Sequence, residues 1–178
     1  MKEIIAHTVV HNGRNFELSL NFDDVGLVDG EFRVGTQVLT WPVDGPKEKA
    51  DYVSAEISIK PDDDGRPILR IELLGNVRGM DGRRAVFEKP LSELLDVEQV
   101  LDWIPAWVFT GDPISGCLVR SGLSALVGQI LDCKKDTSEL HWYVPRMKAL
   151  CRCMLVHIPE MTVTAATRAA KCVWRFGF

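Results

Sequence analysis

Cysteine and histidine have the widest range of chemistry in this chain, and most of them lie in its second half. The cysteines are Cys117, Cys133, Cys151, Cys153 and Cys172. Cys151 and Cys153 are two positions apart, so on a helix their side chains point about 200° from each other and cannot bind one metal ion. A zinc site would need folding to gather them with His141, His157 and Cys172, and the spacing matches no zinc-binding pattern. We therefore expect no metal, no cofactor and cysteines that are buried as thiols.

Enzyme chemistry has little support in the sequence. A cysteine nucleophile would need a histidine base and an orienting polar side chain, and neither His141 nor His157 lies in a local signature of such a site. The sequence has no glycine-rich phosphate loop, no serine nucleophile elbow and no HExxH motif. We therefore expect a protein without enzymatic activity.

Asp62, Asp63 and Asp64 form an acidic run that ends at Gly65. Oxygen ligands and a glycine turn occur in calcium loops, but the glutamate expected further along an EF-hand is missing. Between two strand-like segments, the sequence PDDDGRP is instead typical of a solvent-exposed turn. We expect this acidic tip, on the same acidic sheet face as Asp23, Asp24 and Asp29, to be a candidate surface for a partner.

The last 33 residues contain six basic residues and a single acid, Glu160. Arg168, Lys171 and Arg175 are spaced three and four apart, so a helix would place them on one face. Such a face can bind phosphate backbones, although no helix-turn-helix, zinc-finger or RNA-recognition motif accompanies it. We therefore expect these residues to contact an acidic partner, with nucleic acid as the alternative.

Polar and apolar residues alternate through the first half of the chain, which predicts a sheet with one wet face. The alternation is strictest over 14–22, and the Asn12-Gly13 turn pairs that strand with the one before it. The expected strands are 4–11, 14–22, 31–40, 52–60, 68–74 and 84–88. The fold class is α+β, an antiparallel meander of about five or six strands packed against a bundle of three to five helices.

The longest apolar periodicity covers 112–133 and predicts a nearly surrounded helix that begins at Asp112 and Pro113. Small residues lie mostly on another side of it, where a second backbone could approach closely: Gly116, Ser121, Ser124, Ala125 and Gly128. Other helices are expected within 91–105, over 137–157 with a break at Pro145, and over 165–175. Pro159 should end the helix over 137–157, and Thr164 should cap the last helix.

Charge divides the 178-residue chain. Residues 1–112 carry 12 Lys/Arg against 21 Asp/Glu, and residues 113–178 carry 9 against 4, so the two parts have net charges of −9 and +5. We expect an acidic sheet module over 1–90, a connecting helix and aromatic seam over 91–112, and a basic helical module over 113–178, or one compact domain overall. The two charges either attract each other or meet oppositely charged partners.

The start of the sequence has no signal-peptide pattern, and no long span is uninterrupted by polar residues, so we expect a cytoplasmic protein that binds no membrane. A compact chain with a β-rich start, a helical end, divided charge and no catalytic signature is similar to small phage and mobile-element proteins that bind and block larger host complexes. This resemblance implies an inhibitor and assigns no residue a role.

We therefore expect a non-enzymatic protein-binding protein that docks by charge complementarity onto a larger complex that handles nucleic acid. The alternative is an accessory factor that binds nucleic acid through the basic helices. Trp103, Trp107 or Trp142 would anchor the interface. The candidate partner-binding residues are Asp62, Asp63, Asp64, Trp107, Arg146, Arg152, Arg168, Lys171 and Arg175.

Overall fold

The computed structural model describes residues 2–22, 31–77, 80–105, 113–137 and 144–176. Six strands come first: β1 (Lys2–His11), β2 (Arg14–Phe22), β3 (Phe32–Pro42), β4 (Asp51–Pro61), β5 (Pro67–Val77) and β6 (Met80–Pro90). Four α-helices follow: α1 (Val97–Leu101), α2 (Pro113–Asp136), α3 (Val144–Val156) and α4 (Ile158–Phe176). Two single turns of 3-10 helix, η1 (Lys47–Lys49) and η2 (Leu91–Glu93), complete the described elements. The α+β prediction is confirmed.

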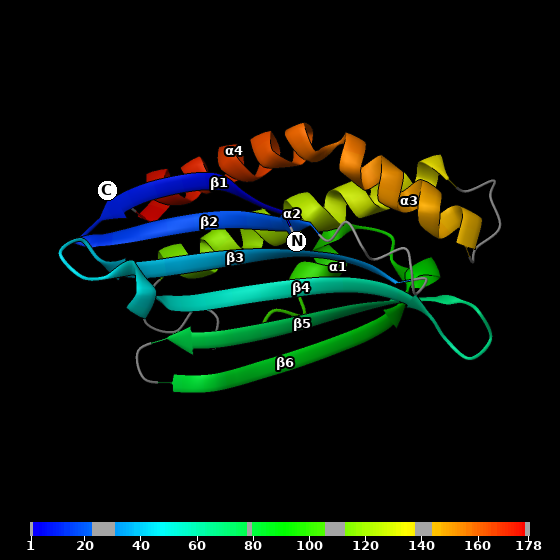
Figure 1. Ribbon diagram of the computed structural model, residues 1–178, viewed down its shortest axis with the longest axis horizontal. Helices are drawn as coiled ribbons and strands as arrows, with labels where there is room; N and C mark the ends of the chain where they lie inside the picture. The colour runs from blue at the N-terminus through cyan, green and yellow to red at the C-terminus, as the bar shows by residue number, and fades with distance from the viewer. Residues whose placement is uncertain (1, 23–30, 78–79, 106–112, 138–143, 177–178) are drawn as a thin grey trace.

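The strands form one antiparallel sheet in the order β1-β2-β3-β4-β5-β6, which is the predicted meander (Figure 1). Asn12 and Gly13 both have positive φ, 49° and 74°, which is the backbone of a two-residue hairpin turn between His11 and Arg14. Gly65 has a φ of 80° in the turn between β4 and β5. Local turn residues therefore set the register of β1 on β2 and of β4 on β5.

One face of the sheet packs against the helices. The β2 side chains on this face are each at most 1% exposed: Phe16, Leu18, Leu20 and Phe22. Opposite them in the register lie the alternate β3 residues Thr40, Val38, Thr36 and Val34, which are also buried. The alternation seen in the sequence thus corresponds to a covered face and an open face.

The central helix, α2, lies behind the sheet and also packs against α4 (Figure 1). It is long and apolar enough to cross a membrane by length and composition, but 72% of its apolar window is buried inside the protein, as in the core helix of a globular protein. Ser121 and Ser124 face α4, where Ser124 accepts a hydrogen bond from Arg168 at 2.7 Å. Two serines of the predicted small-residue side therefore contact side chains of α4.

The segment after the sheet is not the single helix predicted for 91–105. It forms η2 and then α1, which begins with a capping box: Asp96 accepts from the Gln99 amide at 3.0 Å, and the Gln99 side chain accepts from the Asp96 amide at 3.1 Å. Lys134 of α2 donates to the carbonyls of Leu91 and Leu94 at 2.9 and 3.0 Å. A lysine from another element therefore replaces part of the hydrogen bonding that a continuous helix would supply.

The prediction for the last two helices was wrong at their junction. Pro159 does not separate two distant helices, because α4 begins at Ile158, directly after His157 and the end of α3. Pro159 lies in the first turn of α4, where a missing amide proton costs nothing. Thr164 is therefore inside α4 and does not cap it. Pro145 occupies the equivalent place in α3, so the predicted helix start near this proline is confirmed. The part of the predicted helix before it, 138–143, lies outside the described residues.

Apolar residues of the sheet and of the helices form one contiguous core. Trp103, the first aromatic residue of the predicted seam, stacks on Phe87 of β6 with ring centroids 6.0 Å apart. Trp107 and Phe109 lie outside the described residues. The predicted module boundaries at 90 and 112 remain predictions.

Candidate binding surfaces

The face of the sheet opposite the helices is the largest candidate surface, and we call it the open face (Figure 1). Strand pairing places one row of its residues across all six strands: Glu3, Asn21, Gly35, Glu56, Glu72 and Val86. Helices α1 to α4 lie on the other side of the sheet (Figure 1). Among the described elements, no α-helix covers the side chains of the open face.

A hollow of about 310 Å³ lies in the open face around Gly35. Gly35 is buried in β3, and because it has no side chain the surface is low between Asn21 and Glu56. A Cβ at Gly35 would lie 3.1 Å from the Ala55 carbonyl oxygen. The register thus builds a depression at the middle of the row.

Acidic side chains line this hollow from three strands. Glu3 and Glu56 are exposed, and within the described residues neither makes an ion pair or a side-chain hydrogen bond. Three strand spacings separate them, or about 14 Å. Arg33 of β3, which pairs with Glu31 at 3.0 Å, also lines the hollow. The two carboxylates therefore flank the glycine floor without an ion pair to a described residue.

Glu72, the third acid of the hollow, is neutralised. Its carboxylate contacts Arg70 at 2.9 Å and Arg84 at 3.1 Å. The hydrogen bond from Arg84, with a further one from Arg70, holds the pKa of Glu72 below its ordinary value against the opposing effect of burial. The negative charge that remains for a partner therefore lies on the β1 and β4 side of the hollow.

The turn η1 covers the part of the open face that contains Glu17 and Trp41. Lys47 of this turn contacts both oxygens of Glu17 at 3.0 and 3.1 Å, and its ammonium group lies 5.4 Å from the Trp41 ring centre. Glu17 is buried as a result. The chain's own lysine thus covers one acid of the open face.

Exposed aliphatic side chains flank the acids. Ile5 and Val10 of β1 are 55% and 61% exposed, and Val86 of β6 is also exposed. Ile5 and Val10 belong to the open face because they pair with Ser19 and Asn15 of β2. The open face therefore combines negative charge with apolar contact area.

The acidic run at 62–64 forms a hairpin tip, as predicted. Asp62 accepts hydrogen bonds from the backbone amides of Asp64 and Arg66 at 2.9 and 2.8 Å. Its carboxylate therefore stabilises the turn, whereas Asp63 and Asp64 are exposed. The tip lies at one end of the sheet (Figure 1). Asp23, Asp24 and Asp29 lie outside the described residues.

The predicted basic residues do not form one equivalent set. Arg168, Lys171 and Arg175 are all exposed on α4, but Arg168 also donates a hydrogen bond to buried Ser124 of α2. Arg152 is exposed on the separate helix α3. Trp107, Trp142 and the Arg146 side chain lie outside the described residues.

Trp174, which the sequence reasoning missed as an anchor, is 76% exposed between Lys171 and Arg175 on α4. The Arg175 guanidinium lies 5.2 Å from the centre of the Phe176 ring. The end of α4 therefore presents both positive charge and aromatic surface.

The prediction of buried thiols was wrong for four of the five cysteines. Cys117 bonds to Cys172, and Cys133 bonds to Cys153, each with Cα atoms 5.7 Å apart. Cys151 is buried and belongs to neither disulfide. The two bridges join the two ends of α2 to α4 and α3, because α2 runs antiparallel to the α3–α4 pair (Figure 1).

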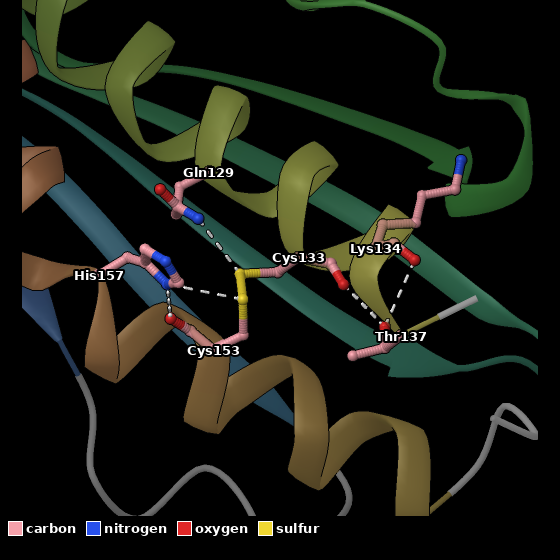
Figure 2. Close-up of a disulfide and its surroundings, with 6 residues drawn as sticks. All are labelled: Gln129, Cys133, Lys134, Thr137, Cys153 and His157. Atoms are coloured by element: carbon pink, nitrogen blue, oxygen red, sulfur yellow. Dashed lines mark hydrogen bonds between the residues drawn. A yellow bond between two sulfur atoms is a disulfide. The ribbon is translucent and has the colours of Figure 1, made fainter. Parts of the chain in front are cut away.

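His157 lies beside the second bridge (Figure 2). Its Nδ1 is 3.7 Å from Cys153 Sγ and 2.7 Å from the Cys153 carbonyl oxygen, and Gln129 approaches Cys133 Sγ at 3.4 Å. The structure thus gathers Cys133, Cys153 and His157. The set considered from the sequence already contained Cys153 and His157, together with Cys151, His141 and Cys172, but it lacked Cys133. The one signal available was the one-turn spacing of Cys153 and His157.

No protein-family model matches the chain, and no curated protein matches its sequence.

Proposed function

We propose that this chain is a non-enzymatic protein-binding protein and that its open face receives a basic segment of a larger partner. The row of residues that crosses the sheet through Glu3, Gly35 and Glu56 carries the proposal. Two basic side chains of such a segment could each pair with one of these carboxylates, which have no partner within the described chain. Apolar side chains next to it would cover Ile5 and Val86.

The two carboxylates of the hollow, Glu3 and Glu56, suggest the class of partner. Protein surfaces that bind nucleic acid are rich in lysine and arginine, and carboxylates on another protein compete with phosphates for those side chains. We therefore propose a complex that handles nucleic acid as the partner, and inhibition of that complex, as by phage and mobile-element proteins, as the outcome.

Two charge-reversal variants test the proposal. Glu3→Lys/Glu56→Lys reverses the acids of the hollow, and Asp63→Lys/Asp64→Lys makes the same change in net charge at the hairpin tip. Asp62 stays unchanged in the control, because its carboxylate holds the turn. Each protein is used as bait in nuclease-treated lysate of the source cells, and retained proteins are quantified by mass spectrometry.

We expect the wild-type protein and the tip variant to retain the same discrete complex and the hollow variant to lose it. A complex that the hollow variant still retains would contradict the assignment of the open face. A complex lost only with the tip variant would instead place the interface at the acidic tip.

A second candidate function rests on the end of α4. Lys171 and Arg175 flank exposed Trp174, and a cationic helix face with an aromatic side chain can bind the backbone and bases of a single-stranded nucleic acid. Lys171→Glu/Arg175→Glu should then abolish binding of a mixed-sequence oligonucleotide whose affinity falls with salt. Equal binding by this variant and the wild type would exclude the second candidate.

A further inference from the structure

The second disulfide lies within a group that has the composition of a metal site. Cys133, Cys153 and His157 each offer one ligand atom, and these three atoms lie within 4.8 Å of one another. Within the part of the chain that the structure describes, this is the one group of three or more His, Cys, Asp or Glu side chains arranged in this way. Two sulfurs and one imidazole nitrogen are a ligand set that zinc prefers.

The arrangement of the helices already places two of these ligands at zinc-binding distance. Cys153 and His157 are one helical turn apart, and Cys153 Sγ is 3.7 Å from His157 Nδ1. In a tetrahedral site with ordinary Zn–S and Zn–N bonds, these two atoms would be about 3.6 Å apart. For both sulfurs to bind one zinc ion, Cys133 Sγ and Cys153 Sγ must move apart to about 3.8 Å.

His157 can turn to a metal without leaving a buried carbonyl unsatisfied. Its Nδ1 now hydrogen-bonds the Cys153 carbonyl oxygen at 2.7 Å. The same oxygen also accepts the backbone amide of His157 at 3.1 Å. The carbonyl therefore keeps a hydrogen-bond donor when Nδ1 binds the ion.

While the disulfide is intact, neither sulfur is a thiolate, and thiolate is the form that binds zinc. A dithiol reductant breaks the S–S bond by giving two electrons and two protons, which makes two thiols and converts the reductant into its own disulfide. Zinc then binds both sulfurs and displaces their two protons. Cys153 and His157 are half-buried, so the group is open to solvent on one side.

We propose that Cys133, Cys153 and His157 form a redox-controlled zinc site, closed as a disulfide when oxidised and able to bind Zn²⁺ when reduced. Three protein ligands leave the fourth position of the ion to water. The end of α2 stays tied to α3 in both states, by a covalent bond in one and by the metal in the other. The packing of α2 on α3 would thus be held in an oxidising compartment and in a reducing one.

The first disulfide is an internal control. Ser121 is the polar side chain beside Cys172, with Oγ 3.3 Å from Sγ. Reduction there releases Cys117 and Cys172 without a histidine ligand in the described surroundings. Each pair has one cysteine on α2, and both pairs belong to one chain, so they can be compared in one sample.

Zinc protection of the thiols tests the proposal in the wild-type chain. The full-length protein is reduced with excess dithiol, desalted without oxygen, and alkylated with and without one equivalent of zinc chloride. Peptide mass spectrometry then measures each cysteine. We expect zinc to slow alkylation of Cys133 and Cys153 at least about tenfold and to leave Cys117 and Cys172 unchanged.

Variants separate a metal site from a general effect of reduction. Cys117→Ala/Cys172→Ala should keep one zinc per chain after reduction, measured by competition with a chromogenic chelator, and His157→Ala should weaken zinc binding at least about tenfold. Near-ultraviolet circular dichroism checks that each variant is folded before zinc is added. Reduced folded protein that binds no zinc, equal affinity in His157→Ala, or protection of all four cysteines would each overturn the proposal.

Discussion

Gly122 of α2 lies directly against Thr36 of β3, and this contact sets how closely the central helix approaches the sheet. A Cβ built on Gly122 would overlap Thr36 Oγ1 and would lie 2.9 Å from Thr36 Cβ and 3.1 Å from Leu18 Cδ1. The Thr36 hydroxyl donates to the Ser19 carbonyl at 3.1 Å inside the core, so moving it away breaks a buried hydrogen bond. A glycine is therefore required at the point where helix and sheet are closest.

Gly122→Ala should destabilise the protein by about 1 to 3 kcal/mol, because the added methyl group forces α2 and β3 apart. This loss opposes a gain of up to about 1 kcal/mol from the higher helix propensity of alanine. Urea unfolding followed by circular dichroism measures the change.

Gly128→Ala is the matched control on the same helix. A Cβ at Gly128 would lie 3.7 Å from Val97 Cγ2, which is ordinary van der Waals contact, so this variant should be as stable as wild type or up to about 1 kcal/mol more stable. Adding Thr36→Ala to Gly122→Ala should recover part of the lost stability, since it removes the overlapping hydroxyl. If Gly122→Ala and Gly128→Ala behaved alike, the close contact would not limit packing.

The sheet could be predicted because its pattern is local. Alternation over 14–22 and the Asn12-Gly13 turn each specify structure within a few residues, and both are confirmed. The helix boundaries near Leu91 were less predictable, because Lys134 satisfies carbonyls from a different element.

The binding surfaces depend on relationships that no short stretch of sequence contains. The hollow exists because the register places Gly35 between Asn21 and Glu56. The disulfides depend on how α2 lies along α3 and α4, so the spacing of Cys133 and Cys153 in the sequence did not suggest a bridge. In the same way, Arg168 has the spacing of a surface residue but binds a serine of α2.

The two disulfides should contribute unequally to the free energy of unfolding. Cys117 and Cys172 are 55 positions apart, whereas Cys133 and Cys153 are 20 apart. Because a longer closed loop restricts the unfolded chain more, removing the first bridge should cost about 4 kcal/mol and removing the second about 3 kcal/mol. Urea unfolding of Cys117→Ala/Cys172→Ala and of Cys133→Ala/Cys153→Ala, both under oxidising conditions, measures the two values.

Reduced wild-type protein in the presence of a chelator provides the reference for this comparison, since it lacks both bridges and any bound zinc. It should be less stable than either double variant. If the 20-residue bridge contributed more than the 55-residue bridge, loop closure would not be the main source of their stabilisation.

The stabilities of alanine variants at Arg168 and Lys171 should distinguish a side chain that stabilises helix packing from one that only carries charge on the surface. Arg168→Ala removes the donor to the buried Ser124 hydroxyl and should cost about 1 to 2 kcal/mol. Lys171→Ala removes the same charge from an exposed position and should change stability by less than about 0.5 kcal/mol. Thermal unfolding at one pH and salt concentration compares them. Equal stability of the two variants would show that the Arg168–Ser124 contact does not stabilise the α2–α4 packing.

The lowered pKa of Glu72 predicts that the stability of the protein depends on pH. Its hydrogen bond from Arg84 keeps its pKa below the ordinary value of 4.5 in the folded protein. A carboxylate with a lowered folded pKa stabilises the protein above its unfolded pKa, and that contribution disappears as the pH falls through the folded value. Wild type should therefore be more stable than Glu72→Gln near neutral pH, and the difference should shrink progressively below about pH 4.5.

Glu56→Gln is the control for Glu72→Gln, because Glu56 lies next to Glu72 in the same row of the open face but makes no ion pair within the described residues. Thermal unfolding of the three proteins across the acidic range gives the comparison. The difference between wild type and Glu56→Gln should stay small across this range. A similar pH-dependent difference for both variants would assign the effect to the overall negative charge of the open face, whereas a difference confined to Glu72→Gln would assign it to the contacts with Arg70 and Arg84.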